Sequence, residues 1–576
     1  MRFLSAIVLF VISLALFAGS LVIRHFFSDP DTLTQTIELT GEAPLIVIDG
    51  EELGRISVNH SVTATFTDGA EADLDVVVGR GRTLDLLAWV GSASYHFITV
   101  DDTTGELTDS LVSGLEPEVP SPSGSDLLVE EWDGIGTVTA PMIIDNDQSV
   151  IIASDGTNPA PSSITIIWNL AVDRTISTIM LYLAAASGFV GLVAFLWGLW
   201  RERRQRRHRQ GRMPRAPKPP RWRPKRPGFL GAKPHEGRRG RRMLGMVAGV
   251  GLIPAILAGC APAESVQPTP TPVETGDQPY VAMTAQQFQR ILDSITGTLE
   301  AADEKRATNI AATRLQGAAL RFREATYRVK GVSPDLGTLF TIPDGTVNLL
   351  LPQQTEGWPR SVFAIVDDTT SETAPSVAII LTQDGPRSNY HVDYTFALEP
   401  GVIMPEVPST EFGTAVLPED TQLLSASPAI VAEQYGDLLL RGKESDFAPL
   451  FVNDTLQEQI GAPAKSDRQT KMTGKAQFSW IESVTDDPPV VFATSDAGAM
   501  IAVTIRESEI VKPVKNGSAI STEGAVRVMS GRSSSLRGIQ ANYEYQLLMY
   551  VPPLGTTDQI KLLGYSYALV SANDLR

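Results

Sequence analysis

The chain has 576 residues, and its composition narrows the classes of function before any motif is considered. Its single cysteine, Cys260, excludes an intramolecular disulfide, and six histidines leave little material for a zinc site. The net charge is −18, yet residues 201–242 carry 18 basic and two acidic side chains. An acidic chain with one basic segment favours a membrane topology over nucleic-acid binding.

Two long uncharged segments predict transmembrane helices. The first lies within residues 1–24 and the second spans residues 175–200, so each reaches the ~20 apolar residues that cross a bilayer. A cleaved signal peptide is the alternative for the first, but its apolar run exceeds the usual ~7–15 residues, which favours an uncleaved anchor. Trp197 and Trp200 are typical of a membrane interface. The lipid bilayer is therefore an expected partner.

The basic segment, residues 201–242, predicts a Pro-rich cytoplasmic loop, because positive residues beside membrane segments stay in the cytoplasm. A patch for nucleic acid or anionic lipid is the alternative. We prefer the loop, and we do not expect nucleic acid as a partner. The large acidic regions on either side are then extracytoplasmic, and the protein belongs in the cytoplasmic membrane.

Residues 30–172 predict a β-rich extracytoplasmic domain. Apolar and polar side chains alternate over residues 58–66, and other short strands are separated by turn residues, which indicates an all-β, sandwich-like fold. Only residues 83–91 look helical. His60 lies on an apolar face and is interpreted as a buried structural histidine. Residues 145–149 (DNDQS) lack the glycine and terminal glutamate of an EF-hand loop, so no metal site is predicted.

Residues 243–260 have the layout of a bacterial lipoprotein signal placed inside the chain. A basic stretch precedes an apolar run that ends in Leu257, Ala258, Gly259 and Cys260, which matches a lipobox. The two small residues would admit a peptidase, and the thiol would accept a diacylglycerol group. The alternative is a third transmembrane helix with an incidental cysteine.

Residues 261–280 are rich in Pro and Thr and predict a tether. If Cys260 is lipidated, cleavage before it divides the product into a two-span membrane protein and a lipid-anchored protein. Another alternative is that the sequence joins the products of two neighbouring genes, the second of which starts at Met213 or Met243.

Residues 281–400 and 427–576 predict two extracytoplasmic α+β modules. In each, helices precede antiparallel strands, so the C-terminal region suggests a tandem duplication of the NTF2-like or cystatin-like sort. In the second module, residues 447–451 and 455–460 predict short helices and residues 525–530 a strand.

The first module begins with a capped helix, as Thr284 and Gln287 indicate. Apolar spacings of three and four predict a second helix over residues 311–329, with Gly331 as its C-terminal cap. Residues 338–342 (TLFTI) predict the first strand after it.

No catalytic site is predicted. His391 and Asp393 share a strand face, but the opposite face is the apolar one, so we expect both side chains to face solvent. Asp486 and Asp487 precede two prolines and indicate a turn. The chain contains none of the common hydrolase, zinc-protease or phosphate-binding motifs, and no cofactor is expected.

Seven stretches resemble a family of uncharacterised actinobacterial membrane proteins. They are VIDG (47–50), LAWVGSASY (87–95), VIIASDG (150–156), LAGC (257–260), GAALRFREATYRVKG (317–331), WPRSVFAIV (358–366) and LLGYSYALVSA (562–572). The resemblance implies the same layout: two spans around a β-rich outer domain, a basic loop, an internal lipobox and a C-terminal outer domain. It implies no activity and no catalytic residues.

We therefore expect a non-catalytic envelope protein or lipoprotein that displays binding or assembly domains to an envelope protein or polymer. The alternative is an envelope enzyme, a hydrolase or glycan-modifying accessory, with its site in a cone-shaped C-terminal pocket. A third hypothesis is an assembly subunit whose two outer parts bind each other.

Overall fold

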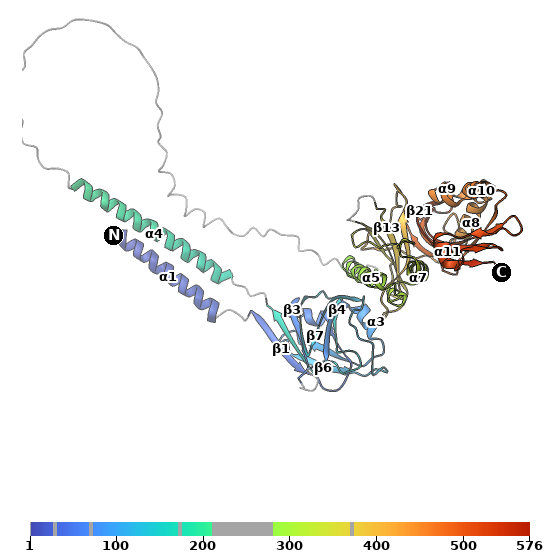
Figure 1. Ribbon diagram of the computed structural model, residues 1–576. Coiled ribbons are helices and arrows are strands. Elements are labelled where there is room, and N and C mark those ends of the chain that lie inside the picture. Colours follow the sequence, from blue (N-terminus) through green and yellow to red (C-terminus); the bar gives the residue numbers. More distant parts are fainter. Residues whose placement is uncertain are drawn as a thin grey trace, which may run out of the picture. The chain divides into compact units, whose positions relative to one another are not determined.

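The computed structural model of the protein describes residues 2–26, 31–67, 73–170, 175–209, 280–368 and 374–575 (Figure 1). The chain is multi-domain and divides into two compact units. The first comprises Met1–Pro30 and Ala171–Asp277, and the second comprises Asp31–Leu170 and Gln278–Arg576. Within the second unit, residues 31–170 are called the β-rich domain and residues 280–575 the C-terminal region.

The described part of the first unit consists of two apolar helices, each long enough to cross a membrane. They are α1 (Arg2–Phe26) and α4 (Thr175–Arg209). They lie side by side (Figure 1). The Ser13 hydroxyl donates to the carbonyl of Ala184 at 2.7 Å, and the Ser20 hydroxyl donates to that of Ser177 at 2.8 Å. Small hydroxyl side chains of this kind allow close packing of helices in lipid.

The β-rich domain contains a four-stranded sheet, in the order β1-β10-β3-β8, and a six-stranded sheet, in the order β6-β5-β2-β9-β4-β7. The strands of the first are β1 (Thr32–Glu38), β3 (Asn59–Thr65), β8 (Thr137–Ile143) and β10 (Ser163–Asn169). Those of the second are β2 (Leu45–Asp49), β4 (Asp75–Arg82), β5 (Tyr95–Val100), β6 (Leu107–Val112), β7 (Leu128–Ile135) and β9 (Gln148–Ala153).

One hydrophobic core joins these two sheets. Alternate residues of a strand point to the same face, so Val62 and Ala64 of β3 meet Ile46 and Ile48 of β2 in one buried cluster. Trp168 of β10 is fully buried there, and its indole N–H donates to the carbonyl of Leu53 at 2.9 Å. The strand predicted from the alternation over residues 58–66 is confirmed by β3.

Two short helices complete the β-rich domain, α2 (Gly50–Gly54) and α3 (Thr83–Val90). The helix expected over residues 83–91 is confirmed by α3. No sequence pattern predicts α2, because its single turn shows no periodicity. It begins where the Asp49 side chain accepts the Glu51 N–H at 3.0 Å.

The first half of the C-terminal region, residues 280–398, has helices followed by four strands. They are α5 (Ala285–Lys305), α6 (Thr308–Ala311), α7 (Gly317–Val332), β11 (Thr346–Pro352), β12 (Arg360–Asp367), β13 (Val377–Gln383) and β14 (His391–Leu398). The capping box of Thr284 and Gln287 is confirmed. The helix boundaries expected from residues 311–329 are wrong, because the Gln316 N–H donates to Val392 of β14 before α7 begins, and Gly331 lies inside α7.

The second half, residues 428–575, also begins with helices, and one further short helix lies between its strands. Its helices are α8 (Pro428–Arg441), α9 (Thr455–Ile460), α10 (Ala462–Lys471) and α11 (Gly524–Ser530), with single turns η1 (Gly442–Glu444) and η2 (Ala448–Leu450). Its strands are β15 (Ala476–Val484), β16 (Val490–Ala493), β17 (Ala499–Pro513), β18 (Ile520–Ser521), β19 (Ser534–Ser535), β20 (Ile539–Val551) and β21 (Lys561–Asp574). The short helix expected over residues 455–460 is confirmed by α9.

Two strand predictions in the C-terminal region are wrong. Residues 338–342 form no strand, because the Arg323 side chain binds the carbonyl of Phe340 and this segment packs against α7 and its core. Residues 525–530 form α11 instead of a strand. Gly524 and Gly531 have φ of +54° and +63°, so the chain turns at both of these positions. The segment between them is only long enough for a short helix.

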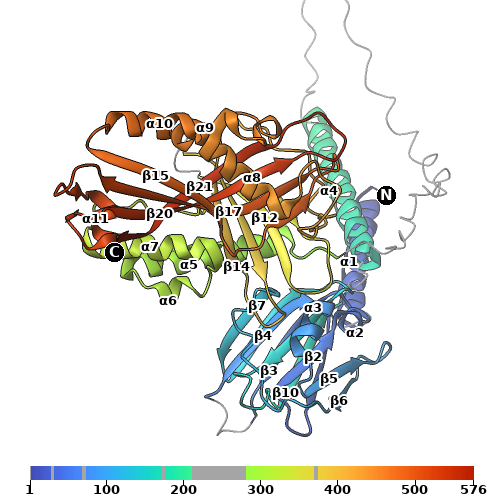
Figure 2. The ribbon, with the colours of Figure 1, turned by 90° about the vertical axis from the view of Figure 1, so that its right-hand side faces the viewer.

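The two halves share one nine-stranded sheet, in the order β11-β12-β13-β14-β21-β20-β17-β15, with β16 beside β17. Helices α5–α7 cover one face of the first four strands, and α8 and α9 cover one face of the second set. The other faces pack against each other, where Phe363 and Ile380 meet Met500 and Leu548. Figure 2 shows the two helix groups on opposite sides of the strands.

A side chain at Gly50 is expected to destabilise the β-rich domain. A Cβ there would press against the backbone carbonyls of Asp145 and Gln148, whereas one at Gly54 would meet only the Asn146 side chain, at 3.3 Å. Gly50→Ala should therefore lower the free energy of unfolding by about 1–3 kcal/mol, and Gly54→Ala should not. Urea unfolding of the purified chain in detergent checks this, and equal effects of the two variants would contradict it.

Candidate functional site

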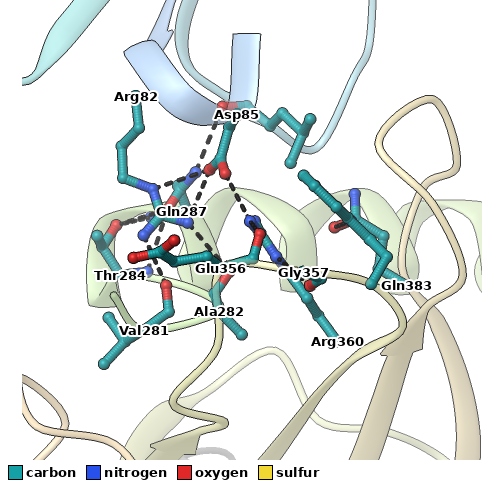
Figure 3. Close-up of polar contacts among 12 residues, drawn as sticks. Arg82, Asp85, Val281, Ala282, Thr284, Gln287, Glu356, Gly357, Arg360 and Gln383 are labelled. Carbon is teal, nitrogen blue, oxygen red and sulfur yellow. Dashed lines mark hydrogen bonds and ion pairs between the residues drawn. The ribbon is translucent and has the colours of Figure 1, made fainter. Parts of the chain in front are cut away.

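Asp85 of the β-rich domain binds two arginines from different parts of the second unit (Figure 3). It lies in the first turn of α3, three residues after Arg82, which ends β4. Arg82 Nε donates to Asp85 Oδ2 at 2.8 Å, and Arg360 Nη2, from the start of β12, donates to Asp85 Oδ1 at 2.7 Å. Asp85 and Arg360 are each only 2% exposed. The cluster thus buries two positive charges and one negative charge.

Backbone carbonyls bind further guanidinium N–H groups of the cluster. Arg82 donates to the carbonyl of Val281 at 2.6 Å, and Arg360 donates to that of Glu356 at 2.9 Å. The Arg360 guanidinium also lies 3.8 Å from the centre of the Trp358 ring. Carbonyl dipoles and an aromatic face offset the unbalanced positive charge of the cluster, as burial of charge requires.

A second buried ion pair joins Asp126 of the β-rich domain to Arg314 of the C-terminal region. Arg314 donates through Nη1 at 2.6 Å and through Nη2 at 3.2 Å, a bidentate geometry. The backbone N–H of Tyr390 donates to the same carboxylate at 2.8 Å. Both members of the pair are buried, so water does not compete for these hydrogen bonds.

A third contact is made by Arg387 at the end of α3. Its guanidinium donates to the carbonyls of Trp89 and Val90, each at 2.8 Å, and to Glu116 Oε2 at 2.8 Å. Because the last carbonyls of a helix have no partner within it, a cation at this end satisfies them and also interacts favourably with the helix dipole.

Most charged groups of the interface are divided between the two parts by sign, with Arg82 of the β-rich domain as an exception. The C-terminal region contributes arginines, including Arg290, which donates to the carbonyl of Ser125 at 3.0 Å. The β-rich domain contributes carboxylates and carbonyls. Trp358 adds an apolar contact with the core beside α3. Guanidinium groups bound to several fixed acceptors orient one surface against another.

No sequence motif points to any of these residues. The one local signal is the three-residue spacing of Arg82 and Asp85, which fits an ion pair across a helical turn. Arg360 lies 275 positions from Asp85, and Arg314 lies 188 positions from Asp126. No periodicity connects residues so far apart.

The predicted lipid acceptor Cys260 and the lipobox residues Leu257, Ala258 and Gly259 lie outside the described residues. His60 is 1% exposed, and burial lowers its pKa, in agreement with its interpretation as a structural histidine. Among the residues that the structure describes, no three His, Cys, Asp or Glu side chains are arranged to hold a metal ion.

The prediction that His391 and Asp393 face solvent is wrong. Both side chains are half-buried, and the start of α7 at Gly317 lies against the Asp393 carboxylate. Burial raises the pKa of Asp393 to about 6, although hydrogen bonds with Thr382 and Gln316 act in the opposite direction. Burial also lowers the pKa of His391.

The turn expected at Asp486 and Asp487 does not reverse the chain, because β15 and β16, on either side of it, both pair antiparallel with β17; Asp487 instead forms ion-pair contacts. Arg321 of α7 donates to Asp487 Oδ1 at 2.8 Å and to Glu544 Oε2 at 3.0 Å, and Arg506 donates to the other oxygen of Glu544 at 3.0 Å. Glu544 is 1% exposed. This network ties the first half of the C-terminal region to the second.

The second half also buries a lysine with two glutamates. Glu482 of β15 lies directly opposite Glu507 of β17, and Lys465 of α10 forms ion pairs with both. Burial and the hydrogen bond with Glu507 raise the pKa of Glu482 to about 8. Glu482 is therefore protonated at neutral pH, so that one proton and one lysine balance two carboxyl groups.

Removal of a buried interface carboxylate is expected to lower the free energy of unfolding more than removal of an exposed one. Asp126→Ala leaves Arg314 and the Tyr390 N–H without their acceptor, so it should lower the free energy of unfolding by about 3–5 kcal/mol. Glu116→Ala should have a much smaller effect, because Arg387 keeps its two carbonyl partners and reaches water. Urea titrations of the two variants and of Asp126→Ala with Arg314→Ala check this, and additive effects of that pair would argue against it.

Stability should fall with rising pH because of Glu482. Its pKa is raised in the folded state, so its contribution is complete below the ordinary value of 4.5 and is lost as pH rises through about 8. Glu482→Gln cannot ionise and should be more stable than the wild type at pH 9 by about 1–3 kcal/mol, with no such gain at pH 5. Urea midpoints at pH 5, 7 and 9 measure this, with Glu433→Gln, an exposed position on α8, as the control. A pH-independent difference would refute it.

Comparisons with known proteins concern the C-terminal region. A family model described as "Domain of unknown function (DUF8094)" matches residues 279–574, just over half of the chain. No curated protein and no solved structure matches. The match begins beside the carbonyls that Arg82 binds and extends through β21. The chain therefore belongs to the DUF8094 family.

Proposed function

We propose that this protein is a non-catalytic cell-envelope membrane protein that displays its β-rich domain and its C-terminal region, bound to each other, on the outer face of the cytoplasmic membrane. The observation that carries the proposal is the buried interface formed around Asp85, Asp126 and Arg387. It belongs to one compact unit that contains both parts. The proposed role is binding or assembly, with the bilayer and an envelope protein or polymer as partners.

The interface constrains the path of the chain across the membrane. The β-rich domain lies between α1 and α4 in sequence, whereas the C-terminal region follows α4. If both helices cross the bilayer, the two parts can meet only when the chain crosses again between residues 210 and 279. The apolar residues 243–259 are the candidate for that crossing, and the basic residues 201–242 favour a cytoplasmic position before it.

Lipidation at Cys260 is part of the proposal. The lipobox supports cleavage before Cys260, which would leave the C-terminal region on a lipid anchor and a tether. The contacts of Asp85, Asp126 and Arg387 would then join two separate polypeptides. Buried ion pairs with additional hydrogen bonds suit such a specific association.

We also propose that the C-terminal region is a tandem duplication of an NTF2-like or cystatin-like α+β fold. Both halves place helices before strands, and the strand order of the shared sheet runs from the first strand to the last in one half and from the last to the first in the other. The strand order thus reverses at the β14–β21 contact. Two related units that met through equivalent strands would give such a reversal.

An envelope enzyme is the alternative function, and the raised pKa values of Asp393 and Glu482 are the observations that would favour it. Glu482, however, is enclosed by Lys465 and Glu507. Asp393 lies against the start of α7. These contacts are those of buried charges within a folded core, which supports the binding role.

The test is the size and association of a C-terminally tagged product in membranes. Wild type should yield a fragment from Cys260 to Arg576 that is lost in Cys260→Ala and with a lipoprotein signal-peptidase inhibitor. The N-terminal product should co-purify with this fragment. Asp85→Arg, which places three arginines together, should abolish co-purification, whereas Glu433→Arg on the surface should not.

Other results separate the parts of the proposal. A full-length band in every lane would make residues 243–259 a third transmembrane helix and would remove lipidation. Fragments that form but separate in the wild type would overturn the association of the two outer parts.

A further inference from the structure

A large cavity lies where the two halves of the C-terminal region join. Strands β14 and β21 pair only through Ala397 with Tyr565 and Leu398 with Gly564. Beyond these pairs β14 keeps β13 as its neighbour on one side, but on the other side the backbone of Thr395 is bound by the side chains of Gln546 of β20 and Ser566 of β21. The sheet therefore splits, and a cavity of about 1190 Å³ opens between α7, α9, α11 and β21.

Aromatic and aliphatic side chains form much of its wall. Tyr543 of β20 and Tyr565 and Tyr567 of β21 line it together with Phe340, and aliphatic residues such as Leu398 lie between them. Tyr567 is 60% exposed, so its ring is accessible. The cavity is somewhat larger than the roughly 300–1,000 Å³ of common ligand pockets, and its mixture of apolar and polar side chains is suited to a small molecule with both kinds of group.

The charged groups of the wall have one sign. Glu399 and Glu523 line the cavity, and no Lys, Arg or His is among its lining residues, all of which lie in the described part of the chain. The Thr455 hydroxyl donates to Glu399 Oε1 at 2.6 Å, and the Tyr565 hydroxyl donates to Gln459 Oε1 at 3.1 Å. These hydrogen bonds orient the carboxylate and the phenol at one end of the cavity.

The tyrosines of the wall also favour a positively charged ligand. Burial raises the pKa of Tyr543 to about 12 and raises that of Tyr565, so both phenols are neutral over the physiological range. The faces of neutral aromatic rings attract cations. A carboxylate with fixed orientation beside such rings favours a positive group and disfavours an anion, while the aliphatic wall favours a hydrocarbon body.

We propose that this cavity binds a small cationic amphiphile, a molecule with an apolar body and one ammonium group. The ammonium lies near Glu399 and the tyrosine rings, and the hydrocarbon part lies along the aliphatic wall. The inference goes beyond the association of the two outer parts and does not depend on the membrane topology or on Cys260.

The experiment titrates octylammonium, octanol and octyl sulfate into the full chain in nanodiscs of zwitterionic lipid, with empty nanodiscs as the reference, by calorimetry. Octylammonium should bind saturably and more tightly than octyl sulfate by roughly fivefold or more, as a charge-assisted hydrogen bond implies. Glu399→Gln keeps an acceptor for Thr455 and should remove this preference. Glu433→Gln removes the same charge from α8 and should leave it unchanged.

Tyr567→Ala provides a second variant at an exposed position, and it should weaken octylammonium binding. Circular dichroism would verify that this variant remains folded. Equal or tighter binding of octyl sulfate would overturn the proposal. So would an octylammonium affinity that Glu399→Gln does not change, or heats no larger than those of empty nanodiscs.

Discussion

The arrangement of the second unit depends on the burial of Asp85 between Arg82 and Arg360. A buried carboxylate is stable only when its charge is balanced and its oxygens accept hydrogen bonds, and a buried guanidinium has the equivalent requirement. Arg360 begins a strand of the C-terminal region, yet its carboxylate partner lies on α3 of the β-rich domain. The charge balance of one part is therefore completed by the other.

The remaining interface contacts follow the same rule and fix the orientation of the two parts. Asp126 with Arg314 and Glu116 with Arg387 lie at other points of the contact. Guanidinium groups suit this role because each has five N–H donors in a rigid plane and can bind a carboxylate and carbonyls at once. Three separate sets of contacts leave little freedom for one part to rotate against the other.

The C-terminal region is held together differently, by a shared sheet and by the packing of two sheet faces. The junction is short, since β14 and β21 pair over two positions only. Arg321 reinforces it by joining α7 to Asp487 and Glu544. The same short pairing leaves room for the cavity beside Glu399, so the way in which the halves join creates the binding site that we propose.

The sequence by itself determined the features that need only near neighbours: the two apolar spans, the alternation of β3, the helix α3 and the capping box at Thr284. It also indicated helices before strands in both halves, because periodicity is local. It did not determine residues 338–342 or 525–530, where the Arg323 contact and the flanking glycines override the local pattern. Only the tertiary structure decided that the two halves share one sheet and that Arg360 meets Asp85. Such contacts join positions 275 residues apart, and their energy comes from burial and charge balance, which no short segment contains.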